Sequence, residues 1–150
     1  KNTDTPEHIK NFVNELVMKN IFSEDEAKLV PCDKMFAFFE SELGNKLKSS
    51  AFVKREVPFN IHISEDFGIP DESSHKVQLQ GVIDCYFKDD DGFTIIDFKS
   101  DKITESNKNS KIANYSKQLE FYKLALQTMY KDASVKTCIY FLDDNTIEWV

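Results

Sequence analysis

Three ionisable side chains, Asp84, Asp97 and Lys99, lie in two apolar stretches that are separated by an acidic turn at residues 89–92. The apolar pattern of both stretches is typical of β-strands, and the Gly-ended turn predicts a hairpin. Side chains alternate between the two faces of a sheet, and directly opposed residues share a face. The hairpin therefore predicts that two carboxylates and one ammonium group lie on the same face.

The hairpin has two possible registers, and both gather these three residues. A turn centred between Asp90 and Asp91 places Asp84 opposite Asp97, whereas a turn centred one residue later places Asp84 opposite Lys99. Two carboxylates across a strand pair repel each other, and a divalent cation held by their oxygens removes that conflict. Two Asp and one Lys around a metal form a constellation that can cleave phosphodiester bonds.

An Asp-x-Lys triplet alone is common at solvated strand ends, so the neighbouring residues have to indicate whether it is catalytic. Asp97 follows an apolar run and precedes Phe98, so it lies inside a strand where an unpaired charge is unfavourable. Downstream, Gln118 and Tyr122 lie four residues apart in a predicted helix and therefore share one face. These features favour a catalytic site.

The ordered motifs resemble those of the PD-(D/E)xK nucleases of the RecB type. The resemblance rests on Gly-Val-Ile-Asp at 81–84, Asp-Phe-Lys-Ser at 97–100 and Gln-Leu-Glu-Phe-Tyr at 118–122. Two upstream stretches, at 38–44 and 55–59, resemble the nuclease region of the AddA family, the helicase–nucleases of bacterial double-strand-break repair. Four ordered motifs are far more specific than Asp-Phe-Lys alone.

The resemblance implies an α/β fold, a restriction-endonuclease-like mixed sheet flanked by helices and preceded by an N-terminal helical segment. On this interpretation residues 1–150 are a single nuclease domain of a larger helicase–nuclease, with a helical lead-in at 1–50 and the nuclease core at 51–150. No Walker A sequence occurs in these residues, so an ATP-driven motor has to lie outside them.

The resemblance also implies roles for the candidate residues. Asp84 and Asp97 would bind Mg²⁺, or Mn²⁺ in its place, with the backbone carbonyl of Phe98 as a third ligand. Lys99 would orient the attacking water or stabilise charge on the scissile phosphate. The helical pair introduced above, Gln118 and Tyr122, would position DNA or brace the lysine.

Some candidates have a purely structural alternative. Glu56 could add an acidic ligand through a water or form a salt bridge within the sheet, and Tyr122 could be an ordinary core aromatic. RecB-type relatives usually carry a metal-binding His upstream in a Gly-containing motif. His8 does not match that motif, so we expect the family His ahead of these residues. His62 and His75 are expected at the surface.

Composition limits the partners and cofactors. The cysteines, Cys32, Cys85 and Cys138, are too far apart in sequence to suggest a zinc site, a disulfide framework or an iron–sulfur cluster. A net charge of −7 is unusual for a domain that captures DNA alone. The stretch 99–117 has five lysines against two acidic residues, which indicates either a phosphate contact or a solvated loop. The charge suggests that another domain or subunit delivers the DNA, and the resemblance to the AddA family implies helicase domains of the parent protein and an AddB-type second subunit.

Two other classes of function stay open. A non-catalytic DNA- or subunit-binding module would keep this fold after losing a ligand, and a different restriction-type endonuclease would share the metal site. The sequence shows no signal peptide and no apolar run near the roughly 20 residues that span a membrane. The resemblance therefore implies a cytoplasmic bacterial protein.

The hydrophobic pattern predicts the other elements. One helix should begin at Pro6 after the N-cap Thr5, and a second after a capping box at 23–26. A third should run from Pro31 to Leu43 and end at Gly44. The remaining expectations are strands at about 52–62, 76–88, 93–100, 135–142 and 146–150, a helix at about 111–131, and a polar loop at 64–75.

Overall fold

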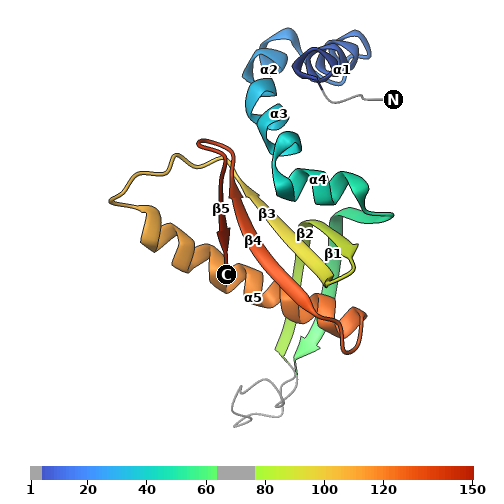
Figure 1. Cartoon of the computed structure of the whole chain (residues 1–150), viewed down its shortest axis with the longest axis vertical. Helices are drawn as coiled ribbons and strands as arrows, with labels where there is room; N and C mark the ends of the chain where they lie inside the picture. The colour runs from blue at the N-terminus through green and yellow to red at the C-terminus, as the bar shows by residue number, and fades with distance from the viewer. Residues whose placement is uncertain (1–4, 64–76) are drawn as a thin grey trace.

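The computed structural model describes residues 5–63 and 77–150, in which a helical lead-in precedes a five-stranded sheet (Figure 1). The helices are α1 (Pro6–Met18), α2 (Glu24–Leu29), α3 (Cys32–Glu40), α4 (Glu42–Ser49) and α5 (Lys108–Met129). The strands are β1 (Phe52–Ile63), β2 (Val77–Asp89), β3 (Gly92–Lys99), β4 (Val135–Phe141) and β5 (Thr146–Trp149). The predicted polar loop at 64–75 lies outside the described residues.

The sheet has the strand order β1-β2-β3-β4-β5 and is mixed. Only the β3–β4 pair is parallel, and α5 forms the crossover between these two strands. A parallel pair needs such a long connection, whereas a tight turn is enough between β2 and β3. The predicted fold class, a mixed α/β sheet with an N-terminal helical segment, is confirmed.

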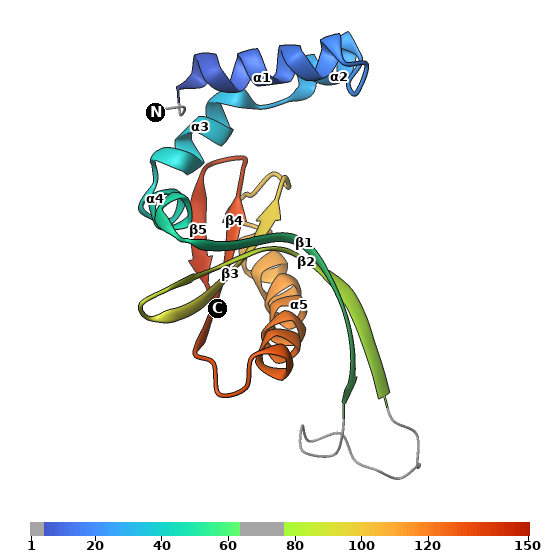
Figure 2. The same cartoon turned by 90° about the vertical axis from the view of Figure 1, so that its right-hand side faces the viewer.

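The two faces of the sheet carry different helices. One face of the sheet, the α5 face, packs against α5 and forms one hydrophobic cluster with it. The other, the lead-in face, packs against α3 and α4 (Figure 2). The buried sheet residues of the α5 face include Ile83, Tyr86, Ile95, Ile139 and Phe141. Those of the lead-in face are Cys85, Phe87, Ile96, Cys138 and Tyr140. Cys85 and Cys138 are therefore small buried residues of the core.

Both long strands change face where Glu56 and Asp84 come together. Val53 faces the lead-in helices, but Val57, also odd-numbered, faces α5. In β2 the same reversal separates Cys85 from Ile83. The β1–β2 register is the same on either side, but regular pairing skips Glu56 and Asp84. Glu56 has a left-handed φ of 49°, which rotates the chain within an otherwise extended strand.

The long β1–β2 ribbon continues past β3 and still covers α5 (Figure 2). Gly81 allows this close packing because a Cβ there would meet the ring of Phe59 at 2.9 Å and that of Tyr122 at 3.8 Å. The ribbon therefore contributes to the hydrophobic cluster under α5 as well as to the sheet.

The first two helices of the lead-in begin as expected, but its third predicted helix is two separate helices. Thr5 caps α1, and Ser23 forms the predicted capping box with Glu26. The predicted helix from Pro31 to Leu43 is wrong, because α3 ends at Glu40 and α4 starts at Glu42. Ser41 accepts the N–H of Gly44 and donates to the carbonyl of Phe38, which starts a new helix.

Gly44 lies inside α4 and does not cap a helix C-terminus. A Cβ at this position would lie 2.1 Å from the Phe38 carbonyl oxygen, so the close approach of α3 and α4 requires glycine. The sequence pattern identified a special glycine, but its role is packing between the two helices.

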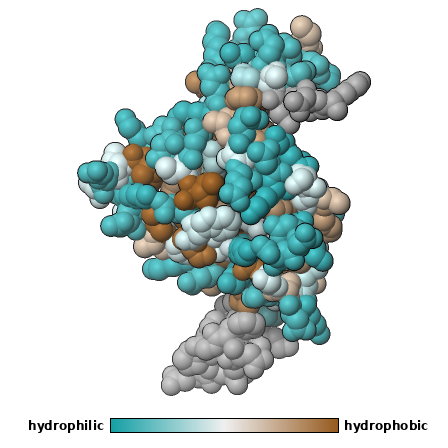
Figure 3. All heavy atoms as spheres, viewed as in Figure 1, coloured by the Kyte–Doolittle hydropathy of each residue, from teal (hydrophilic) through white to brown (hydrophobic). Residues whose placement is uncertain are grey.

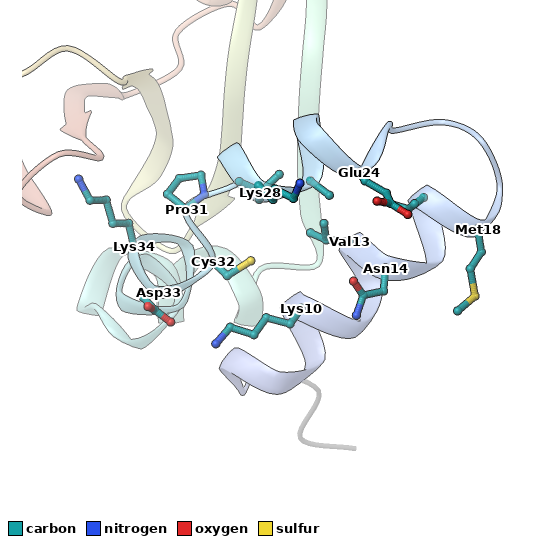
Figure 4. A pocket seen from close by; sticks show the side chains of 13 residues that line it. Lys10, Val13, Asn14, Met18, Glu24, Lys28, Pro31, Cys32, Asp33 and Lys34 are labelled. Atoms are coloured by element: carbon teal, nitrogen blue, oxygen red, sulfur yellow. The ribbon is translucent and has the colours of Figure 1, made fainter.

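The surface is largely hydrophilic in the view of Figure 3, with apolar side chains gathered towards its middle. A hollow of about 870 Å³ lies between α1 and the segment from α2 to α3 (Figure 4). Val13 and Met18 line it from α1, and Pro31 and Cys32 line it from the other side. No helix in residues 5–63 and 77–150 is both long enough and apolar enough to cross a bilayer.

Candidate active site

Asp97 and Lys99 lie near the end of β3, on its α5 face. Asp97 is 1% exposed, and the Lys99 ammonium nitrogen lies 3.0 Å from its Oδ1 and 2.8 Å from its Oδ2. The Oδ1 contact is a hydrogen bond, whereas Oδ2 accepts no hydrogen bond of acceptable geometry from the described residues. The Oδ2 contact is therefore an ion pair without a hydrogen bond. A buried carboxylate oxygen keeps unused acceptor capacity here.

The two predicted carboxylates are neighbours. The β2–β3 register pairs Cys85 with Ile96, so Asp84 and Asp97 occupy the next opposed position, and the alternative register with Asp84 opposite Lys99 is wrong. Burial raises the pKa of Asp97, Lys99 opposes that shift, and the nearby carboxylate of Asp84 adds to it. The site thus holds two carboxylates whose negative charges disfavour each other.

Asp84 also replaces a strand-to-strand hydrogen bond. Its Oδ2 accepts the backbone N–H of Phe98 at 3.1 Å, just beyond the last regular β2–β3 pair. The carbonyl of Lys99 accepts the N–H of Leu142 and so faces β4. Because successive residues of a strand direct their backbone groups to alternate sides, the carbonyl of Phe98 faces the Asp84 side. The Phe98 carbonyl therefore lies on the same side of β3 as Asp84.

Helix α5 supplies neutral partners for Lys99. The ammonium group donates to Gln118 Oε1 at 3.2 Å and lies 4.6 Å from the ring centroid of Tyr115. Gln118 in turn donates from its Nε2 to the hydroxyl of Tyr122. Tyr122 packs edge-on against Phe59 and is 7% exposed, so it is both a core aromatic and a hydrogen-bond partner. Gln118 is therefore held on both sides.

Sequence reasoning missed Tyr115 and the residues that anchor it. The Tyr115 hydroxyl donates to Asp101 Oδ2, and Lys111 binds Asp101 Oδ1 at 2.9 Å. The positions of Tyr115, Gln118 and Tyr122, three and four residues apart, were a usable signal because such residues share a helix face.

Glu56 and Asp84 border a second hollow, of about 400 Å³, between α3 and the sheet. Glu56 is exposed, and its negative charge is among those that raise the pKa of Tyr122, after burial and the carboxylates of Asp97 and Asp84. The structure therefore brings Asp84, Asp97, Lys99 and the α5 residues together and leaves Glu56 at the rim.

The histidines stand apart from this site. His8 is exposed in the first turn of α1, with Nδ1 2.9 Å from Thr5 Oγ1, and His62 is exposed on β1. His75 lies outside the described residues. Among residues 5–63 and 77–150, no three His, Cys, Asp or Glu side chains are arranged to hold a metal.

The donor set nevertheless fits a hard divalent cation. Mg²⁺ prefers oxygen ligands, keeps several waters and is commonly held by one or two carboxylates. The unbonded Oδ2 of Asp97, the adjacent carboxylate of Asp84 and the Phe98 carbonyl supply such oxygens. A cation here would also relieve the repulsion between the two carboxylates.

Known proteins are similar to this chain over nearly its whole length. The family model of the PD-(D/E)XK nuclease superfamily matches residues 2–148. An ATP-dependent helicase/nuclease subunit of Thermoanaerobacter sp. (strain X514) is 35% identical over 148 residues, covering 95% of this chain and 12% of that protein. The protein of the same name from Bacillus licheniformis is 35% identical over 152 residues, covering 94% and 12%.

A third relative, with the same name and from Bacillus cytotoxicus, is 32% identical over 157 residues, covering 98% of this chain and 13% of that protein. The chain thus spans about an eighth of the length of these curated relatives. With its mixed sheet and its paired carboxylates and lysine on β2 and β3, the chain belongs to the PD-(D/E)XK nuclease superfamily.

Proposed function

We propose that residues 1–150 form a single Mg²⁺-dependent deoxyribonuclease domain, with a helical lead-in at 1–50 and a nuclease core at 51–150. In this proposal it is the nuclease of a larger ATP-dependent helicase–nuclease of the AddA type, which acts on DNA ends during double-strand-break repair and recombination. The name that the relatives share, ATP-dependent helicase/nuclease, supports this assignment.

The observation that carries the proposal is the environment of Asp97. A nearly inaccessible carboxylate has one oxygen without a hydrogen bond, a second carboxylate beside it and an ammonium group within 3.0 Å. Such an arrangement is unfavourable for stability alone, since burial and like charge both oppose ionisation. It is well suited to binding a divalent cation beside an ammonium group that can stabilise negative charge on a phosphate.

Each residue then has a distinct task. Asp84, Asp97 and the Phe98 carbonyl would hold the cation, and exposed Glu56 would add a ligand through a water. When bound, a divalent cation would polarise the phosphate and lower the pKa of a water molecule. Lys99 would orient the attacking water or stabilise charge on the scissile phosphate, and Gln118 with Tyr122 keeps Lys99 in place.

The proposed route for DNA follows the charges. Lys102 is exposed in the segment between β3 and α5, and Lys117 is exposed on α5 itself, so both can approach phosphates. A chain with a net charge of −7 binds DNA weakly by itself. We therefore propose that helicase domains of the parent protein and an AddB-type partner subunit deliver the DNA, in the bacterial cytoplasm.

The test compares Asp97→Asn with Asp132→Asn. Mg²⁺ or Mn²⁺ should raise the melting temperature of the wild type because it binds the folded state preferentially. Cleavage of linear DNA should require the metal and stop with EDTA. Asp97→Asn should lose both effects. Asp132, exposed with a φ of 61° that Asn also tolerates, is the matched control and should keep both.

One observation favours the second candidate, a non-catalytic DNA- or subunit-binding module. Within the described part of the chain, only two carboxylates and no His converge on the site. This module would bind DNA or another protein without cleaving, and it would show equal melting temperatures with and without Mg²⁺. That result would replace the nuclease proposal.

A further inference from the structure

Lys99 directly contacts one charged partner and two neutral ones, and the carboxylate of Asp101 attracts it from further away. Asp97 attracts it electrostatically, whereas Gln118 offers an amide oxygen at 3.2 Å and Tyr115 offers its ring at 4.6 Å. We propose that Tyr115, anchored by Asp101, is a positioning residue that keeps Lys99 in the site when Asp97 shares its charge with a divalent cation. The inference rests on the proposed function, because it presumes a cation at Asp97.

A cation at Asp97 would weaken the ion pair that holds Lys99. The Lys99 side chain is 17% exposed and that of Asp97 is fully buried, so their attraction is weakly screened. A divalent cation at Asp97 neutralises the carboxylate and also repels the ammonium group. The partner that held Lys99 most strongly then no longer holds it.

Tyr115 still attracts Lys99 under those conditions. The negative face of an aromatic ring attracts an ammonium group within about 6 Å of its centroid, most strongly where water is excluded. The contact between Lys99 and Tyr115 meets this condition at 4.6 Å. Unlike a carboxylate, the ring does not compete with Asp84 and Asp97 for the cation.

The ring is fixed by contacts on its far side. The Tyr115 hydroxyl donates to Asp101, whose second oxygen accepts from Lys111 at 2.9 Å. These contacts lower the pKa of Asp101, with the Tyr115 hydrogen bond as the main cause, and raise that of Tyr115 to about 12. Asp101 lies just beyond the end of β3, so the same stretch of chain carries both Lys99 and the anchor of its aromatic partner.

The sharpest test measures the mobility of the Lys99 ammonium group by NMR relaxation, with and without Mg²⁺. The wild type should stay ordered in both states. Tyr115→Leu should stay ordered without Mg²⁺, because Asp97 holds the lysine, and become mobile when Mg²⁺ is added. Tyr115→Phe keeps the ring and should restore most of the order. If Lys99 in Tyr115→Leu is as ordered as in the wild type with Mg²⁺, the inference is wrong.

A matched control separates positioning from loss of packing. Tyr130 lies at the end of α5, is half-buried, bonds the Tyr86 hydroxyl at 3.4 Å and stacks on Phe93 at 4.6 Å. Tyr130→Leu should lower the melting temperature as Tyr115→Leu does, but leave Lys99 ordered. Equal mobility of Lys99 in both variants would overturn the inference.

Kinetics provide an independent readout in the wild type and its variants. Tyr115→Leu should lower kcat about tenfold with KM within about twofold, since a misplaced lysine affects the transition state more than binding. Tyr115→Phe should recover most of kcat, and Tyr130→Leu should match the wild type well below its melting temperature. Unchanged kcat in Tyr115→Leu would contradict the inference.

A further variant covers the case in which Tyr115→Leu does not fold. Asp101→Ala removes the anchor but keeps the ring, so with Mg²⁺ it should increase Lys99 mobility to the level of Tyr115→Phe, which loses the same hydrogen bond, and less than Tyr115→Leu would. If the wild type does not cleave DNA, the proposed nuclease activity fails, while the NMR comparison still decides the role of Tyr115.

Discussion

The carboxylates of this site lie in two regions built in opposite ways. Around Asp97, β3 is paired on both sides up to Ile96 and continues against β4, and the side chain is buried. Around Glu56 and Asp84, strand pairing is interrupted, the backbone turns left-handed and the side chains reach the rim. The first region, around Asp97 and Lys99 on β3, is held by the sheet and is called the fixed region. The second, around Glu56 and Asp84, departs from regular strand pairing and is called the irregular region.

The difference shows how one sheet supplies both rigidity and access. Strand β3 is paired on both sides up to Ile96 and with β4 alone beyond it, which positions Asp97 and Lys99 accurately. The interruption at Asp84 leaves Phe98 without a regular partner on β2, so that its N–H bonds the Asp84 side chain, and both residues border the hollow beside α3. Irregular backbone at a functional site is a common arrangement, and here it lies directly beside the most regular strand.

The largest effect is expected when the Lys99 side chain is removed from the fixed region. Lys99→Ala should lower the cleavage rate by about 10² or more, the scale for losing one electrostatic partner of the transition state. Metal binding should persist or tighten, because a neighbouring cation is removed. Calorimetric Mn²⁺ titration and single-turnover cleavage, in the parent protein if the isolated chain is weak, measure the two effects. Exposed Lys136→Ala is the control, and normal cleavage by Lys99→Ala would make the motif non-catalytic.

A smaller effect is expected in the irregular region. Glu56→Gly should raise the free energy of unfolding by ~1 kcal/mol, because glycine adopts a φ of 49° without strain. Guanidinium denaturation measures it. Asn145→Gly, at a φ of 58°, should gain less because Asn already tolerates this conformation. A loss of stability in Glu56→Gly would show that contacts of the side chain, and not backbone strain, dominate there.

The smallest expected effect concerns the end of the fixed region. The folded-state pKa of Asp101 is lowered, so its contribution to stability is present above the unfolded value near 3.8 and is lost as pH falls through the folded pKa. The difference in melting temperature between the wild type and Asp101→Asn should therefore exist at pH 7 and fade below pH 3.8. A difference that grows on acidification would contradict the assigned hydrogen bonds.

The fixed region was largely predictable from sequence. The acidic turn gave the correct register as one of two alternatives, and apolar residues around Asp97 indicated its burial. The four-residue spacing placed Gln118 and Tyr122 on one face of α5. These signals are local, since turn geometry and hydrophobic periodicity depend on near neighbours.

The irregular region was not predictable in the same way. The alternation from Leu79 to Phe87 is uninterrupted in sequence, yet its two halves face opposite sides because the chain turns over at Asp84. Nothing local requires a left-handed Glu56, which depends on how the ribbon wraps α5. The break at Ser41 was missed for another reason, because a good N-cap residue was read as part of a continuous apolar helix.

The parallel pairing of β3 with β4 also determines when the site can assemble during folding. The β2–β3 hairpin needs only a tight turn, so Asp84 and Asp97 can meet early and locally. Lys99 gains Gln118 and Tyr115 only after α5 has formed and the chain has returned as β4. Bringing the carboxylates together therefore needs only a local hairpin, whereas positioning the lysine needs contacts that are distant in sequence.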